Sequence, residues 1–282
     1  MSRHTSKQGG AGKKLVAIIS TIVVVVVAVF LAFRFLTPSS QSASTATSTT
    51  TTSSSQNQSS TYQPSAEEKD YLKNKFDGLK ATNPETIAYV YAPGTQLDEP
   101  VVQTTDNSTY LDKTFDGGNE PLMGTVFMDM DNKKDFSDRL TWLFGHARGS
   151  KVGDHRMFND VNYYSDQSYF DQHKYVVVET PERKYYYEAL AMVIVPEDTA
   201  FYRTSFEDDK DFKEQLDTIY NTTDIKNKDL KVNANDKYLV LSTCREEDPH
   251  IRANLYLRQI PDSEMKDFVA QHGQDLQYTP TR

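Results

Sequence analysis

The 282-residue chain carries 40 acidic and 31 basic side chains, which give a formal net charge of −9 at pH 7. This acidic balance argues against a nucleic acid partner, because phosphate binding requires a basic surface, and it does not favour an anionic lipid surface either. Cys244 is the one cysteine of the sequence, so the chain forms no intramolecular disulfide and its lone thiol needs another explanation.

An uncharged run near the start of the chain, LVAIISTIVVVVVAVFLAF at 15–33, predicts a membrane-spanning helix. A helix of this length, at ~1.5 Å per residue, covers a hydrocarbon core of roughly 30 Å. Bulky residues follow the run where a signal peptide would have a small-residue cleavage site, so we expect an uncleaved anchor at 15–36. Basic residues are more frequent before the run than after it, which places 1–14 in the cytoplasm and the rest outside the cell.

The segment that follows, 37–64, is rich in Ser and Thr and predicts a flexible extracellular stalk. A chain of this kind would hold the next domain a few tens of ångströms from the membrane, on the order of the end-to-end distance of a flexible coil. The remaining sequence has the length of one large domain with its own core, which we assign to 65–262, followed by a polar C-terminal tail at 263–282.

The predicted domain starts with an amphipathic helix and continues as a mostly β fold. Ser65 and Glu68 form a capping box, and Leu72, Phe76 and Leu79 share one face of a helix at 66–80. A second amphipathic helix is expected at 206–220. Short β-rich runs separated by turn residues predict a small closed barrel decorated by helices. The expected strands are 86–92, 100–104, 124–130, 139–147, 175–180, 184–195, 237–243 and 253–260, with 175–180 and 184–195 as the clearest hairpin.

Cys244 lies where the apolar strand KYLVLST ends and a polar loop begins. A free cysteine is often a buried core residue, and position alone leaves that interpretation open. A thiol that is exposed to oxidation outside the cell, at the loop end of a strand, favours a functional residue.

Two further residues are candidates to act with this thiol. His146 lies in WLFGHARG, where glycines allow a backbone or a substrate to approach closely. His250 is its one serious rival, since it is six positions after Cys244 and could fold back onto the thiol. Arg252 opens the last strand eight positions after Cys244, so a hairpin could return it to the thiol, although a surface arginine is the more ordinary case.

Taken together, these motifs resemble those of the sortase family. LSTC at 241–244 is similar to the family's nucleophile motif, FGH at 144–146 to its histidine motif, and Arg252 to its arginine. The stretches PVVQTTDNSTYL at 100–111 and GTVFMD at 124–129 resemble class B sortases, as do the two helices. Phe144 departs from the pattern, because class B members often have Tyr before the glycine. The resemblance implies a closed barrel of about eight strands.

The resemblance also implies a function. Cys244 would attack a backbone carbonyl of a C-terminal sorting signal on a surface protein or pilin of a Gram-positive cell and form a thioester. His146 would transfer protons and Arg252 would stabilise the oxyanion, with no metal or organic cofactor. The acyl acceptor would be an amine of a cell-wall precursor or a pilin lysine. Asn107, Leu111, Ser242 and Thr243 are the substrate-binding residues that the resemblance implies.

Two other functions are compatible with parts of the sequence. A cysteine peptidase or L,D-transpeptidase would also use a thiol, but papain-like enzymes usually place Cys before His, and the Gly-Cys motif of L,D-transpeptidases is missing. A non-catalytic adhesin would suit the anchor, stalk and β domain equally well. Its cysteine, however, would have no reason to be reactive towards solvent reagents.

Overall fold

The computed structural model describes residues 62–121, 123–147, 156–198, 201–245, 248 and 250–281. The predicted cytoplasmic segment, the membrane span and the stalk up to residue 61 lie outside this part of the chain. No helix within the described residues combines the length and the apolar character needed to cross a membrane.

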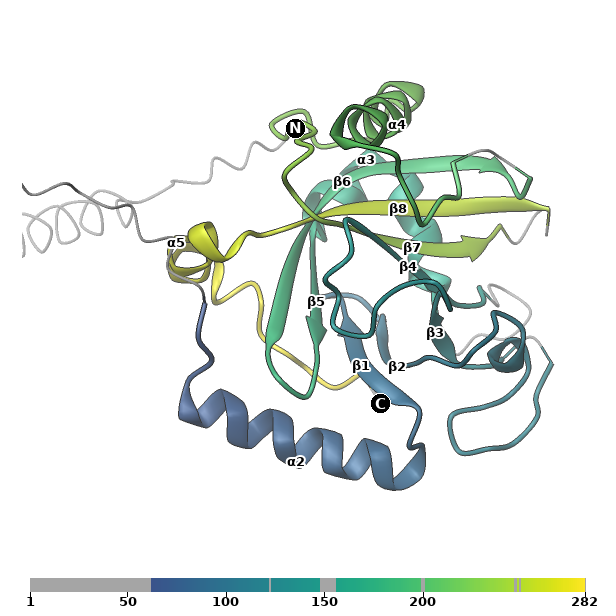
Figure 1. The fold of residues 1–282 in the computed structure, drawn as a ribbon, viewed down its shortest axis with the longest axis vertical. Helices are drawn as coiled ribbons and strands as arrows, with labels where there is room; N and C mark the ends of the chain where they lie inside the picture. Colours follow the sequence, from purple (N-terminus) through teal and green to yellow (C-terminus); the bar gives the residue numbers. More distant parts are fainter. Residues whose placement is uncertain are drawn as a thin grey trace, which may run out of the picture. The chain divides into compact units, whose positions relative to one another are not determined.

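In the described part of the chain, eight strands close into a barrel in the order β1-β2-β3-β4-β7-β8-β6-β5 (Figure 1). The predicted closed barrel is therefore confirmed. Neighbouring strands pair antiparallel except β2 with β3 and β4 with β7, which pair parallel. The strands are β1 (Thr86–Tyr91), β2 (Asp98–Val102), β3 (Val126–Met128), β4 (Leu140–Phe144), β5 (Tyr175–Glu179), β6 (Lys184–Pro196), β7 (Tyr238–Cys244) and β8 (Ile251–Gln259).

The first helix of the domain, α2 (Ala66–Thr82), begins at the predicted cap. The Ser65 hydroxyl accepts a hydrogen bond of 3.1 Å from the Glu68 N–H, which satisfies one of the free donors of the first turn. Leu72 and Phe76 are buried, as the helical spacing predicts. Lys75 reaches the fully buried Glu179 at the end of β5 over 2.8 Å, so an ion pair also ties α2 to the barrel.

The inserted helix, α4 (Asp209–Thr222), lies at the other end of the domain from α2 (Figure 1). Its buried residues Phe212, Leu216 and Ile219 repeat at helical spacing and are completely covered. They pack with Trp142 of β4 and Tyr256 of β8 in one apolar cluster. This cluster covers the outer face of the strands whose ends carry the candidate catalytic residues.

Some local structure was not predicted from the sequence. A 3-10 segment η3 (Asn159–Ser165) and helix α3 (Gln167–Gln172) connect β4 to β5. The segment predicted to be a polar tail, 263–282, contains helix α5 (Asp262–His272), whose Met265 is buried. Leu276 beyond it packs against β1 and β5. So few apolar residues produce no clear periodicity, which is why the sequence pattern missed this helix.

Candidate active site

The ends of β4, β7 and β8 bring the three candidate catalytic residues to one end of the barrel. Cys244 is the last residue of β7 and lies opposite Arg252 in the antiparallel register with β8. Strands β4 and β7 run parallel, with Phe144 opposite Ser242. The C-terminal ends of β4 and β7 therefore lie at the same end of the barrel, so that His146, which follows β4, is near Cys244, the last residue of β7. All three residues line one cavity of about 340 Å³.

His146 is held by a backbone carbonyl. Its Nε2 atom lies 2.7 Å from the carbonyl oxygen of Leu111. A carbonyl can only accept, so Nε2 carries a hydrogen, and in the neutral ring the lone pair is then on Nδ1. The preceding Gly145 passes through a narrow space, because an added Cβ would lie 3.0 Å from both the Phe158 ring and a methyl group of Val126. A larger residue here would therefore require the Phe158 ring or Val126 to shift.

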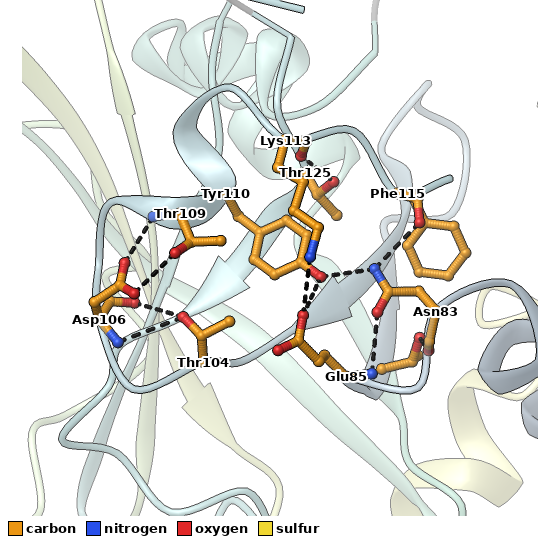
Figure 2. A network of polar contacts seen from close by, with 10 residues as sticks. Asn83, Glu85, Thr104, Asp106, Thr109, Tyr110, Lys113, Phe115 and Thr125 are labelled. Carbon is orange, nitrogen blue, oxygen red and sulfur yellow. Dashed lines mark hydrogen bonds and ion pairs between the residues drawn. The ribbon is translucent and has the colours of Figure 1, made fainter. Parts of the chain in front are cut away.

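The carbonyl that orients His146 belongs to the short helix η1 (Thr109–Leu111) in the connection between β2 and β3. Asp106 stabilises the start of this helix, since its carboxylate accepts from the backbone N–H group of Ser108 at 2.8 Å. The same carboxylate accepts from the backbone N–H group of Thr109 at 2.7 Å (Figure 2). These backbone hydrogen bonds lower the pKa of Asp106 well below its ordinary value, and the bond from Thr109 has the largest effect.

A buried tyrosine fixes η1 from the other side. The Tyr110 hydroxyl donates to a carboxylate oxygen of Glu85 at 2.6 Å and accepts from the Asn83 side-chain amide at 2.7 Å (Figure 2). Tyr110 is 2% exposed, so both bonds are shielded from water on the tyrosine side. Figure 2 shows these contacts joining η1 to the chain just before β1, and they therefore position the Leu111 carbonyl indirectly.

Arg252 is oriented by an acidic residue that follows β6. A terminal nitrogen of its guanidinium donates to Glu197 at 2.6 Å, and the other carboxylate oxygen of Glu197 lies 2.8 Å from Nδ1 of His250. The hydrogen bond from His250 lowers the pKa of Glu197, and the same bond raises the pKa of His250. His250 thus contacts Glu197, and it is not among the described residues that line the cavity with Cys244.

Cys244 is half-buried, and its backbone carbonyl accepts from the Asn162 side chain of η3 at 3.1 Å. The cavity beside it has largely aromatic walls, formed by Tyr110, Phe127, Trp142, Phe144 and Tyr202. Phe144 packs against Phe127 and Tyr202 with ring centroids 5.4 and 6.0 Å apart, so the departure noted in the sequence leaves an apolar wall here. Within the described residues, no group of three or more His, Cys, Asp or Glu could hold a metal ion.

The four residues predicted to bind substrate all line this cavity. Asn107 is occupied within the protein, because its amide donates to Asp129 at 2.9 Å and its oxygen accepts from the Met130 N–H at 2.9 Å. Leu111 is 42% exposed and offers an apolar contact. Ser242 shares the outer face of the barrel with Cys244, whereas strand alternation turns Thr243 towards the interior.

Sequence reasoning missed several residues of this site. Glu197, Tyr202 and Asn254 line the cavity but belong to no motif in the sequence. Asn254 could have been found, because it lies two positions after Arg252 on a predicted strand and therefore faces the same side. Glu197 and Tyr202 lie in the connection between β6 and α4, where no periodicity indicates their direction.

Comparisons with known proteins found curated relatives, although no protein-family model matches the chain. The curated protein Sortase B of Staphylococcus aureus is 28% identical over 181 residues, which cover 64% of this chain and 72% of the relative. Sortase B of Listeria monocytogenes is 24% identical over 200 residues, covering 71% and 77%.

Solved structures of class B sortases share the fold. The Staphylococcus aureus sortase B–substrate complex superposes with a TM-score of 0.61 at 26% identity, covering 69% of this chain and 92% of that one. A sortase B complexed with triglycine gives a TM-score of 0.60 at 28% identity, covering 67% and 87%. In its barrel, in the position of its cysteine at the end of β7 and in these comparisons, the chain resembles class B sortases, which are cysteine transpeptidases.

Proposed function

We propose that this sortase is a membrane-anchored enzyme that cleaves the C-terminal sorting signal of surface proteins and transfers the acyl group to an amine outside the cell. The observation that carries the proposal is the convergence of Cys244, His146 and Arg252 in one cavity at the end of the barrel. The apolar run at 15–33 and the following stalk support an anchored position close to exported substrates and the wall.

The reaction proceeds in two steps. The Cys244 thiolate attacks the carbonyl carbon of the scissile peptide bond, and Arg252 donates hydrogen bonds to the negative oxygen of the tetrahedral intermediate. When the C–N bond breaks, His146 gives a proton to the departing amine and a thioester remains on Cys244. An incoming amine then attacks the thioester, His146 accepts its proton, and the thiolate leaves.

The acceptor is an amine of a cell-wall peptide or a lysine side chain of a pilin. A relative has been solved with triglycine, which supports testing an α-amine first. Triglycine and an Nα-blocked lysine peptide therefore make a matched pair of acceptors, because one presents an α-amine and the other an ε-amine. Formation of product with only one of them identifies the acceptor class.

The transferase activity is tested with the purified enzyme, a randomised pentapeptide library with fixed flanking sequences, and triglycine. We expect peptide–triglycine adducts, detected by mass spectrometry, and none with Cys244→Ala. Hydrolysed peptides without adducts would instead identify a cysteine hydrolase. An unreactive thiol and no cleavage would support an adhesin.

The anchored position is tested separately in intact cells. The full-length chain should sediment with membranes, and its catalytic domain should be digested by a protease added outside. Recovery in the soluble fraction, or protection from the protease, would contradict the proposed location.

A further inference from the structure

The strands that lead to His146 and to Cys244 separate just before these two residues. In the parallel pairing of β4 with β7, the last printed bond of the ladder runs from the Gly145 N–H to the Ser242 carbonyl at 3.2 Å. Bonds of a parallel ladder recur every two residues, so the next one would run from the Ala147 N–H to the Cys244 carbonyl. Strand β4 ends before that position. The Cys244 carbonyl therefore needs another donor.

A side chain from the connection between β4 and β5 supplies this donor. The Asn162 amide, in η3, donates to the Cys244 carbonyl at 3.1 Å. The reverse orientation of the amide would place two acceptor oxygens against each other, so the contact itself requires the N–H group at this position. The oxygen of the Asn162 side chain is buried and has no hydrogen-bond partner among the described residues. Since a buried unpaired oxygen is unfavourable, the amide is explained by the donor that it gives to Cys244.

The peptide group that follows Cys244 is thus fixed on both sides. Its carbonyl accepts from Asn162, and its N–H, which belongs to Arg245, donates to the Ile251 carbonyl of β8 at 2.9 Å. This planar group turns about the Cα–C bond of Cys244, and two bonds on its opposite sides restrict that rotation. They therefore keep the end of β7 from shifting relative to the cavity.

The segment that carries Asn162 also holds the backbone of His146. The Phe158 N–H, at the start of η3, donates to the His146 carbonyl at 2.9 Å. The segment is itself firmly packed, because Phe158 and Val161 are fully buried in the main apolar cluster of the barrel. One short segment thus binds the backbone carbonyls of both His146 and Cys244, and it links their positions to each other.

We propose that Asn162 is a positioning residue of the reaction, which holds the Cys244 carbonyl on the segment that also binds His146 and so keeps the thiol and the imidazole at the separation that proton transfer requires. This inference rests on the proposed transpeptidase function. Proton transfer needs its donor and acceptor within roughly 2.6–3.2 Å, and a misplacement of about 1 Å lowers a rate by about 10²-fold.

Loss of the Asn162 donor should therefore act on the chemical steps. We expect kcat to fall about 10–100-fold. KM should remain close to that of the wild type, because Asn162 is not among the described residues that line the cavity. A residue that served only the stability of the fold would instead leave kcat unchanged at temperatures well below the melting temperature.

The matched variants are Asn162→Asp and Gln167→Glu. Both replace an amide with a carboxylate of the same shape in the connection between β4 and β5, but the Gln167 amide donates to the Lys226 carbonyl at 3.3 Å. The peptide that is most enriched in the library adducts provides a single substrate for kcat and KM with triglycine. Asn162→Asp should show the loss in kcat, and Gln167→Glu should keep the wild-type kcat. Asn162→Ala removes the donor without adding a charge and should also lose kcat.

A spectroscopic signal reports the contact itself. Cys244 is the single cysteine of the chain, so protein labelled with carbonyl-¹³C cysteine contains one labelled backbone carbonyl. A hydrogen bond deshields the carbonyl carbon, so this resonance should move upfield in Asn162→Asp and Asn162→Ala. It should stay in place in Gln167→Glu.

The outcomes separate this proposal from the transpeptidase function. An unmoved carbonyl resonance in the Asn162 variants would overturn the contact, and a moved resonance with unchanged kcat would overturn the positioning role. An equal loss of kcat in Gln167→Glu would also overturn it. If the wild-type enzyme forms no adduct, the transpeptidase function fails, and the rate of Cys244 alkylation by iodoacetamide then replaces kcat. Equal alkylation rates in the wild type and Asn162→Ala would overturn the role of Asn162 in that case.

Discussion

Replacing Tyr110 with Phe removes one oxygen atom from the network that holds η1 beside His146. The hydroxyl makes two short hydrogen bonds, one to the Glu85 carboxylate and one from the Asn83 amide. A bond to a charged group contributes about 1.5–3 kcal/mol. Glu85 has a side chain that is 40% exposed and can be rehydrated, and the Asn83 amide keeps a second acceptor, the Phe115 carbonyl at 3.1 Å. We therefore expect a loss near the lower limit, about 1.5–2 kcal/mol.

For a domain of this size, such a loss lowers the melting temperature by about 3–8 °C, at roughly 2–4 °C per kcal/mol. Calorimetry measures it directly. Tyr185→Phe is the matched control, because its hydroxyl makes one neutral bond of 3.1 Å to the Asp135 carbonyl at an exposed site. This control should lose only about 0.5–1.5 kcal/mol.

Hydrogen exchange of single backbone amides provides a second measurement on the same variants. The Leu111 N–H donates to the Ser108 carbonyl at 3.1 Å within η1. Its hydrogen exchange should quicken in Tyr110→Phe and not in Tyr185→Phe. Equal melting temperatures for the two variants, with unchanged exchange at Leu111, would refute the conclusion that Tyr110 holds η1 in place.

Three further predictions concern the groups around the cavity. His146→Ala should reduce turnover by ~10² or more, as expected for a lost general acid or base, whereas His250→Ala should have a much smaller effect. Single-turnover rates measured with the peptide library compare the two variants. The reverse ranking would give the role of general acid and base to His250. Arg252→Lys should lower the rate of transpeptidation nearly as much as Arg252→Ala, by ~10² to 10³, because lysine keeps the charge but not the oriented pair of donors. Normal turnover of the lysine variant would exclude a role for Arg252 as an oriented donor. The imidazole of His250 should titrate above its ordinary pKa because of its contact with Glu197. Its charge, which stabilises the pair with Glu197, is therefore fully present at low pH and is lost as the pH rises through the raised pKa. In Glu197→Gln the pKa measured by NMR titration should return towards ~6.5, and an unshifted titration curve in both proteins would contradict the pairing.

Several features of this protein follow from the sequence alone, because they depend on neighbours in the chain. The Ser65 cap and the apolar faces of α2 and α4 are local patterns, and the structure contains each of them. The many short β-rich runs and the turns between them were enough to predict a closed barrel. The return of Arg252 to Cys244 also follows from a short connection between two strands, and the register places them opposite each other.

Other features were decided only by the tertiary structure. The parallel pairing of β4 with β7 brings His146 to the same end of the barrel as Cys244, and no local pattern specifies which distant strands become neighbours. The same holds for the Leu111 carbonyl on His146 and for Glu197 on Arg252. A two-residue period gives the face on which Asn254 lies, but its burial without a partner depends on what the other strands and α4 place around it. Contacts between segments far apart in the chain thus determine which polar groups are paired and which are not.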